Sequence, residues 1–306
     1  MRIRAAVLGS PIAHSKSPLL HRSAFAALGL GTSEYSRHEL VADELEAFLD
    51  AHPEHTGFSL TMPLKDRLVT LAAERGWSID DTAALTGAGN TLVRTGDETA
   101  VANTDVRGIV RAIAPHLSAG RNHDVTRESS AGTGRATILG AGATAASALV
   151  ACRDLGIAHV DFRVRRPDRA GRVLDLAARL GLTASVGGLD RIDPSAVVIS
   201  TLPAEAAPEP VWGGPRADWG GVALDVAYAA DSAFLAAAAA HGLHPVIGTA
   251  MLVEQAVAQF EMFFDAAAAT GTDEAGVQLP AGPELLERIA DAMYAALAES
   301  PARSRN

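Results

Sequence analysis

A glycine-rich turn, Gly140-Ala141-Gly142-Ala143-Thr144-Ala145, lies near the middle of this chain of 306 residues. It follows the apolar run 136–139, which predicts a strand, and it precedes an alanine-rich run that predicts a helix. In this context the G-x-G-x-x-A pattern predicts a dinucleotide site, because the glycines allow a tight turn and a close approach to the pyrophosphate; the alternative is a glycine turn that binds no ligand. The helix N-terminus then offers free N–H groups to the anion. Since the turn is central, we expect a separate domain to precede it and to carry the chemistry.

The residues after the turn alternate apolar runs with helical patterns. One helix is expected to continue to Leu155, and a second to pass through Leu174 and Leu180. The further expected strands are 160–164, 196–201, 222–226 and 245–247. Strands that alternate with helices predict a doubly wound parallel sheet of the Rossmann type.

The expected strand 160–164 indicates which dinucleotide binds. An NAD site needs an acidic residue at the C-terminal end of this strand, but Asp161 stands at its start. The end carries Arg165 and Arg166, with Arg169 one turn further on, and guanidinium groups suit a 2′-phosphate. We therefore expect NADP, although these arginines could instead form a solvated surface cluster. To the cofactor site we assign Gly140, Ala141, Gly142, Ala143, Thr144, Arg165, Arg166, Arg169 and Gly248.

The first hundred residues predict a second set of strands and helices. The expected strands are 4–8, 35–40, 57–61, 88–93 and 99–102, with a hairpin turn at Gly96-Asp97, and the expected helices are 17–28, 43–50 and 65–74. A helix from Val106 is expected to end at Ile113 because Pro115 follows it. The polar stretch 118–135 has no apolar period and predicts a loop.

Two helices, 252–269 and 283–297, are expected at the end of the chain. No strand remains for them to extend, so we expect them to pack back on the first domain. The predicted fold is therefore α/β with two domains. Residues 1–104 form the substrate-binding and catalytic domain, residues 105–248 form the Rossmann-type domain, and residues 249–306 return to the first domain.

Two hydroxyl groups follow the first expected strand, in the sequence SPIAHSKSP at 10–18. Alternate positions of an extended segment share one side, so Ser15 and Ser17 can both donate to one carboxylate. The alternative is that Ser17 only caps the helix that begins at Pro18. These residues alone leave both interpretations open.

Further polar residues follow two later strands. Lysine side chains carry their proton at neutral pH, so Lys65, in the sequence SLTMPLK, can protonate a developing alkoxide. Asn90 offers both a donor and an acceptor, and Asp105 can pair with Lys65 and hold it in position. The alternatives are a surface lysine and an aspartate that caps a helix.

Six blocks in this order and spacing, SPIAHSKSP, SLTMPLK, GAGNT, NTD, GAGATA and MLVEQA, resemble the shikimate dehydrogenase family over residues 7–297. The resemblance implies reversible reduction of 3-dehydroshikimate to shikimate by NADPH, on the way to chorismate and the aromatic amino acids. It also implies that Ser15 and Ser17 bind the substrate carboxylate, and that Lys65 and Asp105 form the catalytic pair.

The same resemblance implies further substrate contacts. Thr61, Asn90 and Gln255 contact the ring hydroxyls, and Tyr228 lies near the carboxylate. Gln255 reaches the site because the C-terminal helices return to the first domain.

The chain departs from the family pattern at several positions. Ser59 replaces the usual asparagine before the Thr-x-Pro-x-Lys run, and a hydroxyl can replace only part of an amide's hydrogen bonding. The remaining departures are Ala143 for a glycine, Val164-Arg165-Arg166 for Asn-Arg-Thr, and Ala230 and Ala233 for the proline and threonine expected after Tyr228. None of them removes Lys65 or Asp105.

Three alternative functions remain. A quinate or aminoquinate-type dehydrogenase of the same superfamily, often NAD-dependent, is disfavoured by Ser17 and the two arginines, whereas Ser59 keeps it open. A non-catalytic nucleotide-binding regulator would not need to keep Lys65 and Asp105 together. An S-adenosylmethionine methyltransferase shares the glycine turn but leaves the arginines unexplained.

The composition restricts partners and location. The formal net charge is −10, which disfavours nucleic acid as a partner because phosphate binding needs a basic face. Cys152 is the only cysteine and is expected to be a buried thiol, so we expect neither disulfides nor a multi-cysteine metal site. The chain shows neither a signal peptide nor a run of about 20 apolar residues. We expect a cytoplasmic monomer or homodimer that binds a small-molecule substrate and no metal.

Overall fold

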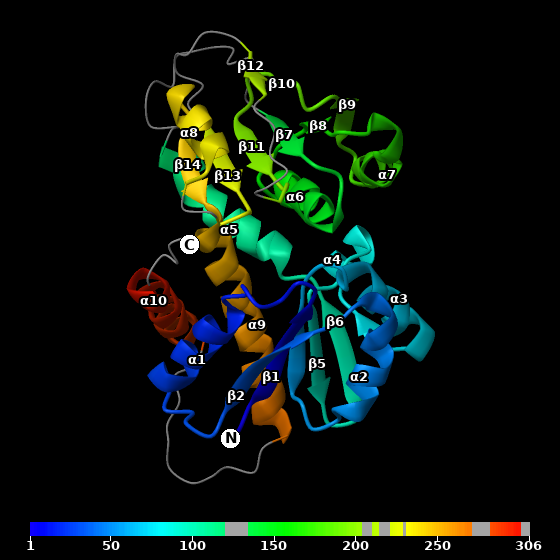
Figure 1. The fold of residues 1–306 in the computed structure, drawn as a ribbon, viewed down its shortest axis with the longest axis vertical. Coiled ribbons are helices and arrows are strands. Elements are labelled where there is room, and N and C mark those ends of the chain that lie inside the picture. Colours follow the sequence, from blue (N-terminus) through cyan, green and yellow to red (C-terminus); the bar gives the residue numbers. More distant parts are fainter. Residues whose placement is uncertain (120–133, 204–209, 214–220, 229–230, 271–281, 301–306) are drawn as a thin grey trace. The chain divides into compact units, whose positions relative to one another are not determined.

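Strands and helices alternate along the chain, and the strands form two large sheets (Figure 1). The computed structural model describes residues 1–119, 134–203, 210–213, 221–228, 231–270 and 282–300. These residues divide into two units: the first is Met1–Thr104 together with the described residues from Val253 on, and the second is Asp105–Leu252. The α/β fold class with two parallel-sheet regions is confirmed.

The first unit is built on a six-stranded sheet of mixed direction. Its strands are β1 (Arg4–Gly9), β2 (Glu34–Glu39), β3 (Gly57–Leu60), β4 (Ser78–Ile79), β5 (Thr91–Thr95) and β6 (Glu98–Ala102), in the order β2-β1-β3-β5-β6-β4. β1 runs parallel to β2 and β3, whereas β5 runs antiparallel to both β3 and β6. The ends of β1, β3 and β6 therefore lie at the same edge of the sheet as the start of β5.

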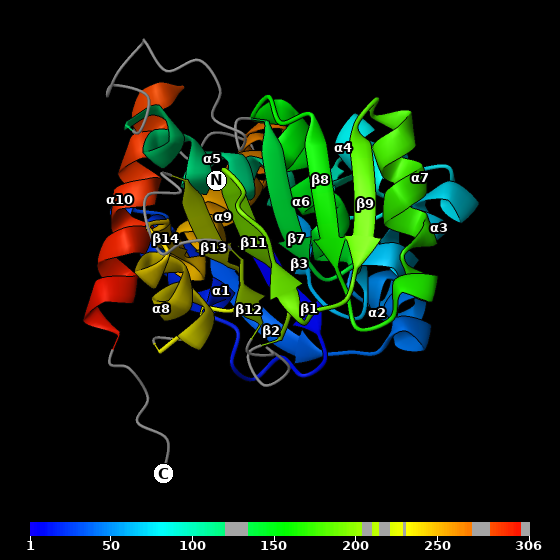
Figure 2. The same cartoon turned by 90° about the horizontal axis from the view of Figure 1, so that it is seen from above.

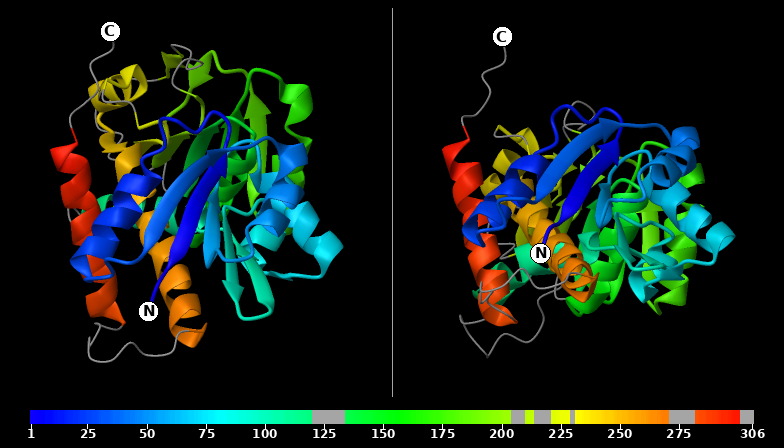
Figure 3. Two further views of the ribbon diagram at one scale, coloured as in Figure 1. Left: turned by 60° about the horizontal axis from the view of Figure 1, so that its bottom comes forward. Right: turned by 90° about the horizontal axis from the view of Figure 1, so that it is seen from below.

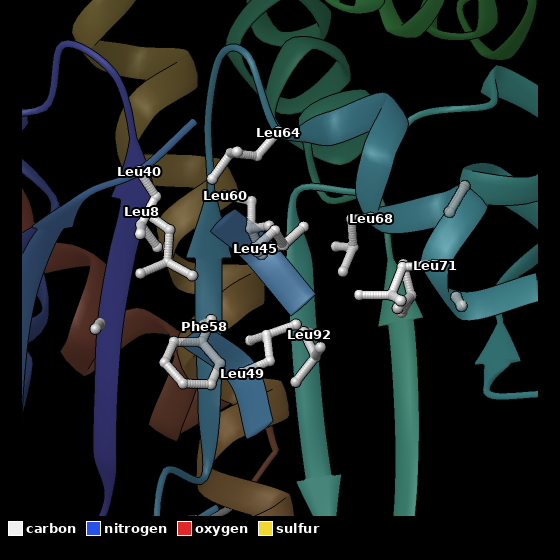
Figure 4. Close-up of a cluster of buried hydrophobic side chains, with 14 residues drawn as sticks. Leu8, Leu40, Leu45, Leu49, Phe58, Leu60, Leu64, Leu68, Leu71 and Leu92 are labelled. Atoms are coloured by element: carbon white, nitrogen blue, oxygen red, sulfur yellow. The ribbon is translucent and has the colours of Figure 1, made fainter. Parts of the chain in front are cut away.

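Leucine side chains pack one face of this sheet against α2 (Leu45–Ala51) and α3 (Lys65–Arg75) (Figure 4). The buried cluster includes Leu8, Leu45, Leu49, Phe58, Leu60, Leu64, Leu68, Leu71 and Leu92. Each such side chain contributes about 1.5–3 kcal/mol when it is removed from water. Because strand residues alternate between faces, Phe58 and Leu60 face this cluster and Ser59 faces the opposite side.

The opposite face of the sheet is covered by α1 (Ser17–Ala27) and by α9 (Gly248–Thr270), which continues from the second unit into the first. A Cβ at Gly57 would lie 2.5 Å from the Leu92 carbonyl oxygen and from the Phe263 ring, so only glycine allows α9 to approach β3 this closely. α10 (Pro283–Glu299) packs along α1, as Figure 3 shows. The C-terminal helices thus belong to the first unit.

The second unit contains a six-stranded sheet in which every neighbouring pair is parallel (Figure 2). Its strands are β7 (Arg135–Leu139), β8 (His159–Arg163), β9 (Thr183–Gly187), β11 (Val197–Ser200), β13 (Val222–Asp225) and β14 (His244–Ile247), in the order β14-β13-β11-β7-β8-β9. This order is that of a dinucleotide-binding sheet, and the direction of winding reverses between β7 and β11. Ligands of such sheets bind beyond the strand ends at this reversal.

Helices cover both faces of the second sheet. α6 (Ala143–Asp154) packs against α5 (Asp105–Ala119) and α7 (Gly171–Arg179), while α8 (Ala233–Ala240) packs on β13 and β14. A short pair, β10 (Arg191–Ile192) and β12 (Val211–Trp212), lies outside the large sheet. Cys152 is fully buried on α6, and burial raises the pKa of its thiol to about 12, so the expected buried thiol is confirmed.

Most expected elements agree with the structure, but two expectations differ. α5 continues through Pro115 to Ala119, so ending this helix at Ile113 was wrong. Proline removes one hydrogen bond, and the contacts of α5 with α6, β13 and β14 compensate for that loss. β9 was missed, as were β4 and α4 (Asp81–Thr86), because these segments are short or largely polar. Most of the expected loop 118–135, residues 120–133, lies outside the described residues.

His21 is the most deeply buried basic group of the first unit. Its ring is fully buried between α1 and α9, stacks on Tyr35 with centroids 4.2 Å apart, and contacts Phe260 and Phe263. Neither ring nitrogen has a hydrogen bond of good geometry among the described residues. Burial lowers the pKa of His21 to about 3, and the neighbouring Gln259 side chain offsets part of this shift. The imidazole is therefore neutral in the folded protein.

We predict that His21→Phe makes stability less sensitive to acid. Between about pH 6.5 and 3, the unfolded chain binds a proton at His21 that the folded chain does not, so stability falls as the pH falls. One such group changes the free energy of unfolding by about 1.4 kcal/mol per pH unit. Urea unfolding should show the variant gaining about 2 kcal/mol on the wild type between pH 6.5 and 5. An identical difference at both pH values would contradict a neutral buried His21.

Candidate functional site

Polar residues of the first unit gather at one edge of its sheet. The backbone N–H of Ser10, just after β1, donates to the Met62 carbonyl, just after β3, at 2.9 Å. Leu60 at the end of β3 donates its N–H to the Asn90 carbonyl at 2.7 Å, and Asn90 donates its own N–H to the Ala102 carbonyl at 3.0 Å. The three strand ends are thus tied together, and their following residues share one site.

Ser15 and Ser17 are joined by a hydrogen bond, but the segment that carries them is not extended. Lys16 has helical backbone angles, φ −89° and ψ −5°, which corrects the expected alternation along an extended chain. The N–H of Ser17 donates to the Ser15 hydroxyl at 3.3 Å, and this short turn holds the two serines together. No side chain caps α1, and the buried Ser17 hydroxyl lies next to that of Tyr35. The interpretation of Ser17 as only a helix cap is therefore wrong.

Asn90 is buried and its side-chain amide has a fixed orientation. Its Oδ1 accepts a hydrogen bond from the backbone N–H of Thr104 at 2.8 Å and another from the Thr91 hydroxyl at 2.8 Å. A backbone N–H can only donate, so the oxygen must face Thr104 and the Nδ2 group must face the other way. Nδ2 lies 2.9 Å from the Thr104 hydroxyl and 3.5 Å from Oε1 of Gln255 on α9.

Lys65 and Thr61 lie in the same connection after β3. Lys65 is the first residue of α3 and is half-buried, and its carbonyl accepts a hydrogen bond from Gly89 at 2.9 Å. Thr61 is half-buried, and its N–H donates to the Leu8 carbonyl at 2.9 Å. Asp105 is buried at the start of α5, the first residue of the second unit. Lys65 and Asp105 thus belong to different units, and their pairing stays a prediction.

The glycine-rich turn follows β7, at the reversal of the second sheet. Gly140 has φ +111°, and a Cβ there would collide with the Thr201 hydroxyl, which itself donates to the Leu139 carbonyl at 2.7 Å. Gly142 is exposed and precedes α6, no side chain caps this helix, and the space around Gly142 is open. Ala143 and Thr144 form the first turn of α6, while Ala141 lies beside the glycines. These free N–H groups and the open approach fit a dinucleotide pyrophosphate.

Gly248 provides a second close approach in the second unit. It begins α9, and a Cβ there would lie 2.8 Å from the Val226 carbonyl oxygen and would collide with that of Asp225. No larger residue fits at this position without moving the end of β13.

The arginines after β8 differ in their partners. Arg166 pairs with Asp168 at 3.1 Å, and both side chains are exposed. Arg165 and Arg169 are also exposed, and neither makes an ion pair with any described residue. Two free guanidinium groups beyond the strand fit an added phosphate better than a bare ribose.

Asp161 is held inside the second sheet. Its Oδ2 accepts a hydrogen bond from Arg163 Nε at 2.9 Å, and its Oδ1 accepts one from the Ser185 hydroxyl at 2.8 Å. The carboxylate is 4% exposed and its oxygens are already occupied. Asp161 lies in the middle of β8 and not at its start as expected, and its role in the sheet is structural.

Tyr228 follows β13 in the second unit. Burial raises the pKa of its phenol, so the hydroxyl keeps its proton at neutral pH. The connection that carries it is held by Asp225, which accepts hydrogen bonds from the Ala227 N–H at 3.2 Å and from the Ser232 hydroxyl at 2.5 Å. Ala230, one of the departures noted in the sequence, lies outside the described residues.

Two residues that contact the site were not predicted from the sequence. Gln259 lies one helical turn after Gln255 on α9, and its Nε2 donates to the Asn90 carbonyl at 3.0 Å. Tyr35 on β2 donates to Ser59 at 2.7 Å. The spacing of Gln255 and Gln259 could have indicated a common helix face, since residues four apart are neighbours. Nothing local marks Tyr35, which sits in an ordinary strand.

Two further properties concern the described part of the chain. No group of three or more histidine, cysteine, aspartate or glutamate side chains there is arranged to hold a metal ion. No helix there has the length and apolar character needed to cross a membrane.

This chain is similar to several known proteins. Residues 7–92 match the family model of the shikimate dehydrogenase substrate binding domain. Shikimate dehydrogenase (NADP(+)) from Methylibium petroleiphilum is 34% identical, over 85% of this chain and 88% of the relative. The crystal structure of Mycobacterium tuberculosis shikimate dehydrogenase superposes with a TM-score of 0.71 at 32% identity, covering 97% of this chain and 99% of that one.

A further solved structure is that of shikimate 5-dehydrogenase from Thermus thermophilus in complex with NADP(H) and shikimate. It superposes with a TM-score of 0.65 at 28% identity, and 96% of this chain and 99% of that one are covered. Identity above 30% over most of both chains, together with the matched substrate-binding domain, shows that the chain belongs to the shikimate dehydrogenase family.

Proposed function

We propose that this protein is an NADP-dependent shikimate dehydrogenase, an oxidoreductase that acts on a CH–OH group in aromatic amino acid biosynthesis. It reduces 3-dehydroshikimate to shikimate and catalyses the reverse reaction. The observation that carries the proposal is the family membership combined with the sheet edge at which Ser17, Asn90 and Lys65 gather. The relative from Methylibium petroleiphilum bears the NADP(+) name, and the Thermus structure contains NADP(H) and shikimate.

The first unit would bind the substrate from two sides. Ser15 and Ser17 would donate hydrogen bonds to the substrate carboxylate. Two hydroxyl donors would stabilise its negative charge without a basic residue. Thr61, Asn90 and Gln255 would contact the ring hydroxyls, and the fixed Nδ2 of Asn90 acts there as a donor. Tyr228 would approach the carboxylate from the second unit.

The reduction needs one hydride and one proton. NADPH, held by the second unit, would supply the hydride to the ketone carbon. Lys65 would deliver the proton to the ketone oxygen as it becomes an alkoxide, and Asp105 would hold the ammonium group in place. The chain has only two lysines, Lys16 and Lys65, although it is rich in arginine. A lysine is required at position 65 because an arginine side chain does not release its proton in proteins.

The second unit would hold the cofactor. Gly140, Gly142 and the first turn of α6, with Ala141, Ala143 and Thr144, would receive the pyrophosphate. Arg165 and Arg169 would bind the 2′-phosphate, with Arg166 beside them and paired to Asp168. Gly248 would leave room at the end of β13.

We also propose the domain division in which residues 1–104 carry the substrate chemistry and residues 105–248 bind the cofactor. The acidic net charge of −10 supports a protein without a nucleic-acid partner. A monomer or homodimer in the cytoplasm completes the proposal, and sedimentation of the purified protein would establish its oligomeric state.

Steady-state rates with four substrate pairs test the proposed function. We expect shikimate with NADP+ to give the highest kcat/KM among shikimate and quinate, each with NADP+ and NAD+. The free guanidinium groups of Arg165 and Arg169 favour the phosphorylated cofactor. Higher kcat/KM for quinate with NAD+ would instead establish a quinate-type dehydrogenase.

Substitution of Lys65 tests the proton donor. We expect Lys65→Met to lower kcat by about 10²–10⁴-fold, the usual contribution of a positioned acid or base, while the Kd of NADP+ stays unchanged. Lys65→Arg keeps the charge but cannot release a proton, so it should be nearly as inactive. Initial rates and cofactor fluorescence measure both quantities. Turnover of Lys65→Met within a few fold of wild type would remove Lys65 from this role.

Substitution of the arginines tests cofactor choice. We expect the double variant Arg165→Ala and Arg169→Ala to lower the preference for NADP+ over NAD+ by about tenfold or more, because each loses a charge-assisted contact to the 2′-phosphate. Arg153→Ala is the matched control, since Arg153 is an exposed arginine of the same unit that pairs with Asp154 at 2.7 Å. An equal decrease in kcat/KM with NADP+ and NAD+ would show that the arginines do not bind the 2′-phosphate.

A further inference from the structure

A chain of buried hydrogen bonds crosses the first unit from β2 to the start of β5. The Tyr35 hydroxyl lies 2.7 Å from the Ser59 hydroxyl, which lies 2.7 Å from Oε1 of Gln259. Nε2 of Gln259 lies 3.0 Å from the Asn90 carbonyl oxygen and 3.1 Å from the Thr91 hydroxyl. Every one of these residues is buried. The chain thus connects three strands and the C-terminal helix α9.

Every hydrogen bond of this chain has a determined direction. The Asn90 carbonyl can only accept, so the amide nitrogen of Gln259 faces it and the amide oxygen faces Ser59. Ser59 must then donate its single proton to Gln259, and it can only accept from Tyr35. Thr91 accepts from Gln259 and donates to Oδ1 of Asn90 at 2.8 Å. One backbone carbonyl therefore orients all four side chains.

Both ends of the chain meet residues that the proposed function assigns to the substrate. At one end, the Ser17 hydroxyl lies next to that of Tyr35, and Ser17 would turn its own proton to the substrate carboxylate. At the other end, Asn90 and Gln255 would contact the ring hydroxyls. Ser59 is 3% exposed and its proton is committed to Gln259, so it is not available to donate to a substrate.

We propose that Tyr35, Ser59 and Gln259 are positioning residues that hold the carboxylate-binding Ser17 and the hydroxyl-binding Asn90 at a fixed separation. This inference rests on the proposed function, because it takes the substrate roles of Ser17 and Asn90 from there. The three residues contact those groups and not the substrate. Substrate binding therefore depends on a hydrogen-bond chain that passes behind the site.

The packing around Tyr35 explains why its hydroxyl can serve as the start of the chain. His21 stacks on the Tyr35 ring at 4.2 Å with the two planes 6° apart, so the ring cannot rotate freely. Burial raises the pKa of the Tyr35 phenol, with the hydrogen bonds to Ser59 and Ser17 acting in the opposite direction. The hydroxyl therefore keeps its proton at neutral pH and remains a donor.

Two single variants and their combination test the proposal. Tyr35→Phe removes only the hydroxyl, and Gln259→Met keeps the approximate length of the side chain without its amide. We expect each to weaken shikimate binding by about tenfold, because Ser17 and Asn90 are no longer held at the separation that the substrate requires. Isothermal titration of shikimate into the full-length protein without cofactor measures this Kd directly. In steady state, KM for shikimate should rise more than kcat falls, and KM for NADP+ should not change.

The double variant separates a connected chain from two local effects. If these residues act through one connected series of hydrogen bonds, the double variant Tyr35→Phe and Gln259→Met should bind shikimate no more weakly than the weaker-binding single variant. Multiplication of the two single effects, or shikimate affinity unchanged in both single variants, overturns the proposal. Ser195→Ala is the matched control, because Ser195 is a buried serine of the second unit whose hydroxyl lies 2.7 Å from that of Thr137. It should lower thermal stability without changing the Kd of shikimate.

A separate pair of variants distinguishes failure of this inference from failure of the proposed function. Ser17→Ala and Asn90→Ala remove the residues assigned to the substrate itself. If both leave the Kd of shikimate unchanged, the assigned site is wrong and the positioning chain is overturned with it. If both weaken binding while Tyr35→Phe and Gln259→Met do not, the site stands and only the positioning role fails.

Discussion

The carbonyl oxygen of Asn90 is the acceptor on which the polar centre of the first unit depends. It receives the N–H of Leu60 at 2.7 Å, which closes β3 against the start of β5, and Nε2 of Gln259 at 3.0 Å, which ties α9 to the same point. Two segments far apart in the chain therefore meet at one atom. Because a carbonyl cannot donate, the amide of Gln259 has a single orientation, and the remaining side chains follow from it. A backbone atom thus determines how the side chains of this centre are oriented.

The two units offer different kinds of binding group. The second unit presents backbone: a glycine turn, an uncapped helix and an open approach, which suit any dinucleotide. Among the described residues, the arginines after β8 are its candidate groups for distinguishing NADP from NAD. Asp161 is not available to bind a ribose hydroxyl, because Arg163 and Ser185 already donate to its oxygens. The first unit presents side chains on strand ends, which can distinguish one small polar ring from another. Under the proposed function, selectivity for the substrate would therefore reside in the first unit.

Sequence patterns predicted well what local chemistry determines. The expected ranges of β1, β3, β11, β13 and α6 agree with the structure to within about two residues, and the glycine turn stands at the reversal of the sheet. The polar blocks carrying Ser17 and Lys65 were found because each follows an apolar strand, whereas Asn90 was placed inside the expected strand 88–93 and in fact precedes β5. Pro115 was misjudged because proline is only a local signal, and helix contacts made elsewhere outweigh it.

What could not be predicted is the set of contacts between distant segments. Ser59 was judged alone, as a poor substitute for an amide, whereas the structure supplies an amide from Gln259 next to it. Tyr35 carries no sequence signal, since its role arises from β2 lying beside β1 and from the stacking of His21. The turn at Lys16 was likewise beyond the reach of an argument from alternating residues.

The contact between Ser59 and Gln259 also has a consequence for how this chain can diverge. The two oxygen atoms lie 2.7 Å apart in a buried space, although their residues stand 200 positions apart. A longer side chain at position 59 would need a shorter one at position 259, and a change at either alone would leave a cavity or an overlap. We therefore expect substitutions at positions 59 and 259 to occur together in related sequences.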